Sequence, residues 1–186
     1  KRQTGCAAMI REYFPDAYCK SVFSIDYKKL YAKGIRALLF DIDNTLVHHG
    51  DDATPEIEAL FRRLHRMGLK TILITDNDQA RTQRFLRNLD VPYICDANKP
   101  SPEAYLRALQ MLQVKKSQAV VIGDQIFKDI RGANNSGIPS ILVQFIRAPG
   151  ETWIGWRRYL EYLLLAVWRM TRSHRPGEHI CNKNER

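Results

Sequence analysis

Residues 36–46 read Arg-Ala-Leu-Leu-Phe-Asp-Ile-Asp-Asn-Thr-Leu, an apolar run that ends in two carboxylates. The run at 37–40 is short and follows Gly34, which predicts a central parallel strand covered on both faces. Because residues two apart on an extended chain point the same way, we expect the side chains of Asp41 and Asp43 to face one crevice. That crevice would lie at the carboxyl end of the strand, where open α/β sheets bind ligands.

Two carboxylates in one crevice can divide the labour of a group transfer. One attacks as a nucleophile, while the other handles the proton of the leaving group. A divalent cation makes it tolerable to hold both negative charges beside a phosphate. An Asp-x-Asp pair is common by chance, so this interpretation depends on further motifs along the chain.

Four motifs together carry a family resemblance. Residues 41–46 resemble the first motif of the haloacid dehalogenase (HAD) superfamily of aspartate-nucleophile phosphatases. Residues 72–77, Ile-Leu-Ile-Thr-Asp-Asn, resemble the second motif, a strand that ends in Thr or Ser. Lys99-Pro100 resembles the third, and residues 123–129, Gly-Asp-Gln-Ile-Phe-Lys-Asp, resemble the fourth. Their order and spacing are those of the superfamily.

Helix and strand signals alternate through the proposed HAD phosphatase domain, residues 36–146. This alternation predicts an α/β fold with a doubly wound, Rossmann-like parallel sheet of five strands. The expected strands are 37–40, 70–75, 92–95, 119–123 and 140–144, and the expected helices are 54–68, 79–89, 101–112 and 126–135. Thr54 as N-cap and Pro55 at the first helical position mark the start of the first of these helices. Right-handed crossovers would bring the strand ends that carry motifs to one edge.

The resemblance implies a task for each motif residue. Asp41 is the expected nucleophile, which forms an aspartyl-phosphate, and Asp43 the general acid that later deprotonates the attacking water. Thr75, through its hydroxyl and backbone N–H, and Lys99 are expected to hold the phosphoryl oxygens and offset their charge. Asn77 is expected to orient the phosphate loop.

Mg²⁺ is the expected cofactor, because it prefers hard oxygen ligands and the cluster contains neither Cys nor His. Its expected ligands are Asp41, the backbone carbonyl of Asp43, and Asp124. Asp129 is expected to lie outside these ligands and to support the metal site or Lys99. Each residue also has a plainer interpretation as a turn residue, strand end, loop lysine or helix cap. Taken together, the plainer interpretations require several coincidences at successive strand ends.

The motif spacing leaves no room for the cap domain that many HAD enzymes carry. Residues 46–53 form a short loop and residues 91–99 are mostly strand, so we expect an open crevice that admits a phosphate carried on something large. The chain is similar to the YqeG-type branch of the uncapped subclass IIIA, which is related to phosphatidylglycerophosphatases. Residues 13–18, Tyr-Phe-Pro-Asp-Ala-Tyr, add to this similarity. Asp76 departs from the branch, which favours Asn there, and is expected to weaken phosphate binding or shift the pH range.

Residues 1–35 are expected to form an N-terminal lead-in. It contains a short helix capped by Ser24 and closed by Gly34, whose Tyr27, Leu30 and Tyr31 are expected to pack. Residues 48–52 are polar and are expected to form a flexible flap over the crevice. We interpret the two histidines of this loop, His48 and His49, as solvated, with metal binding as the alternative.

The net charge of +9 is concentrated in the ends of the chain. Residues 1–36 carry eight basic and three acidic side chains, residues 37–146 thirteen of each, and residues 147–186 eight basic and four acidic. A neutral body with basic ends predicts an anionic partner, such as a membrane surface, a lipid phosphate or nucleic acid. Simple solubility is the alternative.

Residues 147–175 are expected to form an amphipathic basic C-terminal helix, followed by a flexible tail at 176–186. We interpret His174, His179 and Cys181 as part of a frayed chain end, with metal binding as the alternative. On a helical wheel one polar arc contains Arg157, Arg158, Glu161, Arg169 and Arg172. The opposite side contains Trp156, Tyr159, Leu160, Leu163, Val167 and Met170, although Leu165 and Trp168 fall within the arginine arc. This pattern is typical of a helix that lies in a membrane interface. Docking on the sheet or on a dimer partner is the alternative.

The four cysteines show no paired spacing, which predicts reduced thiols and a cytoplasmic location. With the basic helix described above, we expect the protein to lie on the inner face of the membrane. Lys1–Arg11 lacks the apolar run of a secretory signal, and no stretch approaches the roughly 20 apolar residues of a spanning helix.

Three functions follow from these observations. The first is a Mg²⁺-dependent phosphatase of an interfacial anionic phospholipid, with phosphatidylglycerophosphate as the expected substrate. The second is the same chemistry on a soluble phosphomonoester, such as a nucleotide or sugar phosphate. The third is a non-enzymatic HAD-fold binding module whose basic termini bind RNA or a partner, which the intact motif set disfavours.

Overall fold

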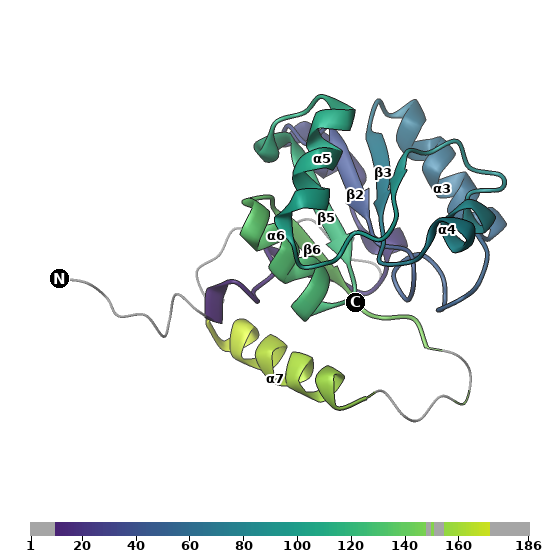
Figure 1. Ribbon diagram of the computed structural model, residues 1–186. Helices are drawn as coiled ribbons and strands as arrows, with labels where there is room; N and C mark the ends of the chain where they lie inside the picture. The colour runs from purple at the N-terminus through teal and green to yellow at the C-terminus, as the bar shows by residue number, and fades with distance from the viewer. Residues whose placement is uncertain (1–9, 148–149, 151–154, 172–186) are drawn as a thin grey trace.

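Within the described part of the chain, six parallel strands form one sheet in the order β1-β6-β5-β2-β3-β4 (Figure 1). The computed structural model describes residues 10–147, 150 and 155–171. The strands are β1 (Ala17–Cys19), β2 (Ala37–Phe40), β3 (Lys70–Ile74), β4 (Tyr93–Ile94), β5 (Ala119–Gly123) and β6 (Ser140–Val143). The chain leaves β2 toward β3 on one side and later returns to β5 on the other, so the strand order reverses at β2. Such a switch point opens a crevice at the carboxyl ends of the strands.

Helices cover both faces of the sheet and one edge. They are α2 (Tyr27–Ala32), α3 (Pro55–Arg66), α4 (Gln79–Phe85), α5 (Pro102–Leu112), α6 (Arg131–Ser136) and α7 (Gly155–Thr171), with short turns η1 (Val22–Ser24), η2 (Lys116–Gln118) and the π-helical η3 (Ile126–Ile130). The Thr54 hydroxyl caps α3 by accepting from the Ile57 amide at 3.4 Å, as its sequence predicts. The helix expected at 79–89 ends at Phe85, and the one expected at 126–135 begins with the π-helical turn.

Alternate residues of the central strand β2 serve two separate cores. Leu38 and Phe40 pack with α2, α3 and α4 on one face, whereas Ala37 and Leu39 pack with α5 and α6 on the other. Figure 1 shows these two helical layers on either side of the sheet. Burial on both faces explains why β2 is apolar at every position, and it confirms the expected α/β architecture.

The lead-in contributes a sixth strand that the sequence did not predict. β1 pairs in parallel with β6, and the amide of Ser140 donates to the Asp16 carboxylate at 2.9 Å. Three residues are too few to show a strand periodicity, and their partner lies more than 120 residues further along the chain. The expected sheet of five strands is therefore wrong by this one edge strand.

The expected cap of the lead-in helix is also wrong. Asp26, not Ser24, caps α2, with the Lys29 amide donating to its carboxylate at 3.0 Å. Ser24 lies in η1, where its hydroxyl donates to the Ser21 carbonyl at 2.8 Å. Tyr27 and Leu30 are buried as expected, but Tyr31 is exposed and stacks under the guanidinium of Arg36.

The cysteines differ from the expectation of reduced thiols. Cys95 is a free thiol, but Cys19 is disulfide-bonded. Cys6 and Cys181 lie outside the described residues. The cysteine count therefore does not support a reducing compartment.

Helix α7 docks on the body through a third apolar cluster. Leu165 and Trp168 are buried there against Phe14, Ile126 and Leu142. On the helical wheel these two residues fell on the same side as the arginines. The helix therefore packs through that side, which confirms the alternative prediction that it docks on the sheet. Val167, expected on the opposite side, also packs against this cluster.

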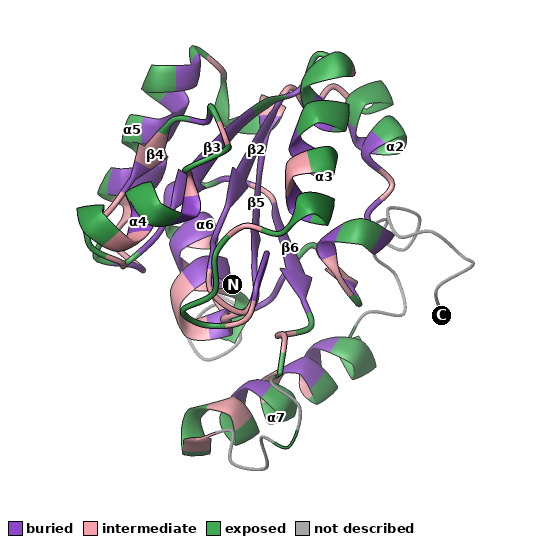
Figure 2. Ribbon diagram, turned by 90° about the vertical axis from the view of Figure 1, so that its right-hand side faces the viewer, coloured by how far each residue is buried: buried purple, intermediate pink, exposed green. Residues whose placement is uncertain are grey.

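The opposite side of α7 remains exposed (Figure 2). We call it the outer apolar face, and it consists of Trp156, Tyr159, Leu160, Leu163 and Met170, with exposed fractions from 42% to 74%. No helix in the described ranges is long and apolar enough to cross a bilayer. Arg172, His174, His179 and the expected tail at 176–186 lie outside the described residues.

Candidate active site

Three buried carboxylates meet at the carboxyl edge of the sheet. Asp41 follows β2, Asp124 follows β5, and Asp129 lies in η3; one oxygen of each lies within 4.8 Å of the others. Gly123 permits this approach, because a Cβ built on it would lie 2.3 Å from Cγ of Asp129. An all-oxygen donor set of three carboxylates suits Mg²⁺. Asp129 thus lies in the cluster beside Asp41 and Asp124. We had expected it to lie further out and to support the metal ligands or Lys99.

Lys99 is the cation of this cluster. Its Nζ lies 2.6 Å from Oδ1 of Asp41 and 2.7 Å from Oδ1 of Asp129, and its side chain is only 3% exposed. Burial alone would lower the pKa of Lys99, but the two carboxylates raise it well above its usual value. The lysine is therefore a fixed positive charge directly beside the expected nucleophile.

Asp76 positions the loop that carries Lys99. Its Oδ1 accepts from the backbone amide of Lys99 at 2.9 Å, and its Oδ2 pairs with Nζ of Lys128 at 2.8 Å. Because this carboxylate is paired with Lys128, it does not stand as a lone negative charge beside the phosphate loop. We therefore infer that Asp76 positions Lys99. This role replaces the weaker phosphate binding that we expected from the difference between Asp76 and the family pattern.

Thr45 joins two members of the acidic cluster, a contact that the sequence did not reveal. Its hydroxyl lies 3.2 Å from Oδ2 of Asp41 and 3.1 Å from Oδ1 of Asp124. Thr45 belongs to the first motif, four residues after Asp41. This position in the motif was the sequence feature from which its place in the site could have been predicted. The turn that follows β2 folds it back, with the Leu46 amide donating to the Ile42 carbonyl at 2.9 Å.

The carboxylate of Asp43 has different neighbours from that of Asp41. Asn77 donates to it at 2.7 Å, Arg81 at 3.0 Å and the Gly50 amide at 3.2 Å. Burial would raise the pKa of Asp43, but the hydrogen bonds from Asn77 and Gly50 and the charge of Arg81 lower it overall. The expected acid–base residue therefore rests as a carboxylate just outside the acidic cluster.

Arg81, which the sequence did not single out, also holds the loop at 48–52. Its Nη2 donates to the Asp51 carbonyl at 2.6 Å, and Arg84 donates to the Gly50 carbonyl at 2.7 Å. The expected flap is thus tied to α4. His48 and His49 are not part of the acidic cluster found among the described residues. The side chain of His49 is 72% exposed, as expected, but its Nδ1 lies 3.3 Å from Oδ2 of Asp43.

Thr75 lies buried at the end of β3, as expected, but its amide is not available to a phosphate. That amide donates to the Ile94 carbonyl at 3.0 Å within the sheet. Its hydroxyl oxygen accepts from the Asn77 amide at 3.1 Å, so the hydroxyl proton remains for an oxygen of a ligand. The part of the prediction that used the Thr75 amide is therefore wrong.

Burial raises the pKa values of two cluster carboxyls. The pKa of Asp41 is raised to about 7, chiefly by burial, with Lys99 opposing and Asp129 adding to the rise. The pKa of Asp124 is raised to about 6, again chiefly by burial, with Arg158 opposing. A cation at this site would favour the ionised forms.

Helix α7 reaches the cluster through Arg158. This guanidinium pairs with the Asp124 carboxylate and also donates to the Asp124 carbonyl at 2.8 Å. It bonds Glu161 at 2.8 Å as well, and Glu161 accepts from the Ile126 amide at 2.9 Å. Arg158 and Glu161, which we placed in the polar arc of a membrane-interface helix, instead anchor α7 to the fourth motif.

The geometry and the comparisons define the class of protein. Residues 49–137 match the family of haloacid dehalogenase-like hydrolases. The chain is 35% identical to "Probable phosphatase YqeG" of Bacillus subtilis (strain 168) over 137 residues, which cover 73% of this chain and 80% of that protein. The chain belongs to the haloacid dehalogenase-like hydrolases and is a phosphoric monoester hydrolase.

More distant proteins agree with this assignment. "Phosphatidylglycerophosphate phosphatase 1, chloroplastic" of Chlamydomonas reinhardtii is 22% identical over 178 residues, which cover 90% of this chain and 66% of that protein. A 4-nitrophenylphosphatase from Thermotoga maritima superposes with a TM-score of 0.51 at 13% identity, covering 63% of this chain and 89% of that one. At that identity the structural likeness shows the shared fold alone.

Proposed function

We propose that this phosphatase is Mg²⁺-dependent, forms an aspartyl-phosphate on Asp41, and acts on phosphatidylglycerophosphate at a membrane surface. The observation that carries the chemistry is the contact of Lys99 with both Asp41 and Asp129 inside a buried acidic cluster. A phosphoryl group beside this lysine meets a fixed positive charge and an adjacent carboxylate nucleophile.

The residues divide the reaction into two steps. An oxygen of Asp41 attacks phosphorus, the bond to the leaving oxygen breaks, and that oxygen takes a proton from Asp43. Asp43 is a carboxylate in the free site, so it takes up this proton from solvent when the negatively charged phosphate binds beside it. A water molecule then attacks the aspartyl-phosphate, Asp43 takes its proton, and inorganic phosphate leaves with Asp41 restored. Lys99 and the Thr75 hydroxyl hold phosphoryl oxygens. Bound Mg²⁺, held by Asp41, Asp124 and the Asp43 carbonyl with Asp129 adjacent, would offset the charge on the phosphoryl group.

Substitution of the two first-motif aspartates tests the chemistry. Asp41→Asn should abolish turnover of a small aryl phosphate, and Asp43→Asn should slow it about 10²-fold to 10⁴-fold. Asp90→Asn makes the same chemical change at an exposed position away from the site and serves as the control. Near-normal turnover by Asp41→Asn would exclude the aspartyl-phosphate.

The outer apolar face of α7 supports a membrane-bound substrate. Its aromatic and aliphatic side chains are exposed, and Arg157 and Arg169 on the same helix are also exposed. Apolar side chains can enter the acyl boundary, and each basic residue near an anionic surface adds roughly 1 kcal/mol. The relative named as a phosphatidylglycerophosphate phosphatase supports the lipid substrate. We therefore place the enzyme at a membrane surface. The cysteines, from which we had inferred a cytoplasmic location, do not support that part of the prediction, because Cys19 is disulfide-bonded.

A vesicle experiment tests this location and substrate. Arg157→Gln with Arg169→Gln should lower binding to anionic vesicles and turnover of lipid phosphate, while hydrolysis of a soluble aryl phosphate stays unchanged. The pair Arg87→Gln with Arg107→Gln removes the same charge from exposed positions on other parts of the molecule. Vesicle binding unaltered by the α7 pair would favour the soluble phosphomonoester instead.

A further inference from the structure

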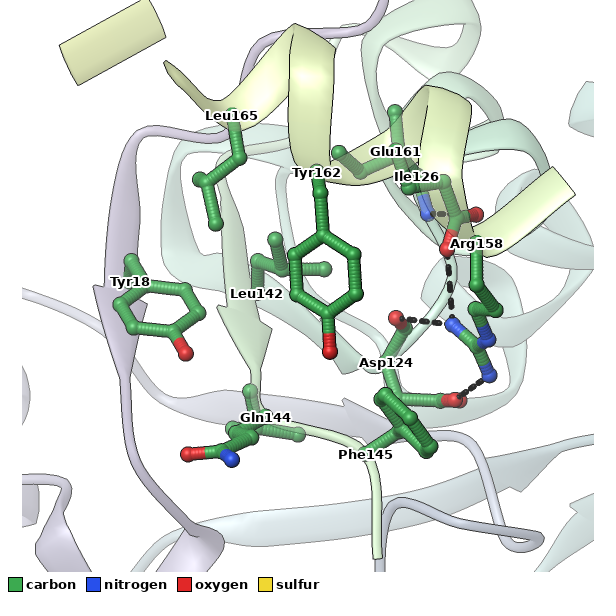
Figure 3. A pocket seen from close by; sticks show the side chains of 11 residues that line it. Tyr18, Asp124, Ile126, Leu142, Gln144, Phe145, Arg158, Glu161, Tyr162 and Leu165 are labelled. Carbon is green, nitrogen blue, oxygen red and sulfur yellow. Dashed lines mark hydrogen bonds and ion pairs between the residues drawn. The ribbon is translucent and has the colours of Figure 1, made fainter. Parts of the chain in front are cut away.

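Arg158 joins α7 to the fourth motif from outside the acidic cluster (Figure 3). Its Nη2 pairs with Oδ2 of Asp124, and its Nη1 donates to the Asp124 carbonyl at 2.8 Å. The side chain of Asp124 is fully buried, and that of Arg158 is 14% exposed. The pocket beside this contact holds only about 30 Å³, room for a water molecule or two, so Arg158 lies in a packed interface.

The two oxygens of the Asp124 carboxylate have different neighbours. Oδ1 lies 3.1 Å from the Thr45 hydroxyl, which is also 3.2 Å from Oδ2 of Asp41. Oδ1 therefore lies on the side of Asp41, and Oδ2 on the side of α7. Arg158 holds Oδ2 and leaves Oδ1 for a cation in the cluster, so it fixes the direction of the carboxylate without blocking it.

Arg158 is itself held in place by two neighbours. Glu161, one turn further along α7, accepts from its Nη1 at 2.8 Å, and Phe145 lies against its guanidinium, with 4.7 Å between the ring centre and Cζ. Glu161 also accepts from the Ile126 amide at 2.9 Å, at the start of η3 (Figure 3). Because η3 carries Asp129, α7 contacts both parts of the fourth motif that supply carboxylates to the cluster.

Contacts behind a metal ligand affect how tightly the metal binds. Removal of a group that orients a ligating carboxylate typically weakens metal affinity about 10-fold to 100-fold. Arginine suits this task, because its planar fork holds a carboxylate oxygen and a carbonyl at the same time. Its positive charge would also repel a cation, but Glu161 pairs with Arg158 and offsets that charge. The orienting effect is therefore the larger of the two.

We propose that Arg158 is a positioning residue for Mg²⁺ binding, so that the metal site is complete only when α7 is docked. This inference deepens the proposed function and rests on it, because it takes Mg²⁺ to bind at Asp124. The effect is mutual: if docked α7 strengthens Mg²⁺ binding, then Mg²⁺ strengthens the docking of α7 by the same factor. The helix that presents the outer apolar face thus also supports the reaction centre.

Calorimetric titration with Mg²⁺, without substrate and at about pH 8 to limit competition from protons, measures this effect. Arg158→Gln should weaken Mg²⁺ binding about 10-fold to 100-fold. Arg158→Lys keeps the charge but not the fork, and its affinity should lie between those of wild type and Arg158→Gln. Arg62→Gln is the matched control and should bind Mg²⁺ as wild type does. Arg62 also pairs with a carboxylate of its own helix, Glu58 at 3.5 Å, but it is 62% exposed and lies outside the cluster.

Hydrogen–deuterium exchange tests the link to docking without any measurement of activity. Mg²⁺ should slow exchange of the α7 amides in wild type and should slow it much less in Arg158→Gln. Trp168→Ala removes buried packing under α7 but keeps Arg158, and it should also weaken Mg²⁺ binding. If Arg158→Gln does not fold, Arg158→Lys and Trp168→Ala decide the question, and wild-type Mg²⁺ affinity in both would overturn the proposal.

The possible results separate this inference from the function on which it rests. Equal or tighter Mg²⁺ binding by Arg158→Gln would overturn the positioning role and leave the Mg²⁺-dependent phosphatase intact. No Mg²⁺ binding by wild type would overturn the metal dependence, and the positioning role with it. Arg158→Gln should also need about 10-fold to 100-fold more Mg²⁺ for half-maximal hydrolysis of 4-nitrophenyl phosphate, and should approach wild-type turnover at saturating Mg²⁺. A loss of turnover that no Mg²⁺ concentration restores would contradict a role through the metal.

Discussion

Replacing Lys99 with Met should be among the most destabilising single changes in this protein. The substitution removes a buried ammonium group that lies 2.6 Å from Asp41 and 2.7 Å from Asp129. Removing one partner of a buried ion pair costs about 3–5 kcal/mol, because the other charge is left without compensation. Lys128→Met is the control, since Lys128 pairs with Asp76 at 2.8 Å but is 37% exposed. An exposed pair of this kind contributes only about 0–1 kcal/mol.

The loss should also depend on pH in a defined direction. The pKa of Asp41 is already raised to about 7 from its usual 3.8, and removal of Lys99 would raise it further. A folded carboxyl with a raised pKa keeps a proton that the unfolded chain releases, so its contribution to stability is present at low pH and is lost as the pH rises through the folded-state pKa. The cost of Lys99→Met should therefore be smallest near about pH 5 and largest near about pH 8.

Urea unfolding of both variants in the absence of divalent ions measures this effect. The free energy of unfolding of Lys99→Met should fall below that of Lys128→Met by a margin that widens as the pH rises. Equal losses for the two variants, or a loss for Lys99→Met that does not change with pH, would refute the assignment of Lys99 as the charge that stabilises the buried carboxylates.

Two other predictions concern the same cluster. Gly123→Ala places a Cβ 2.3 Å from Cγ of Asp129 and should lower the free energy of unfolding by about 1–3 kcal/mol, as overpacked sites do; an unchanged urea midpoint would mean that the loop adjusts freely. Mg²⁺ affinity, measured by calorimetry, should rise between about pH 5.5 and about pH 7.5 with release of protons, because Asp41 and Asp124 have pKa values raised to about 7 and about 6 and must ionise to bind a cation. An affinity that stays constant across this range would contradict the raised pKa values.

Local sequence determined the core of the fold and most of the residues that meet at the candidate site. The apolar run before Asp41 and the alternation of strand and helix signals depend on short-range periodicity, and the structure confirms them. Parallel strands joined by right-handed crossovers end at one edge, so the ordered motifs placed Asp41, Lys99 and Asp124 together. The placement of these residues follows from chain order and therefore needs no knowledge of side-chain packing.

Tertiary structure alone decided how the ends of the chain meet this core. The pairing of β1 with β6 and the contact of Arg158 with Asp124 join segments far apart in the chain, and no local pattern specifies such contacts. On α7, the helical wheel grouped Leu165 and Trp168 with the arginines, and their burial in a shape-matched cluster determined which side docks. Both sides of α7 carry large apolar groups, so hydrophobicity along the sequence could not rank them. Packing against Phe14, Ile126 and Leu142 made that choice and left the outer apolar face exposed.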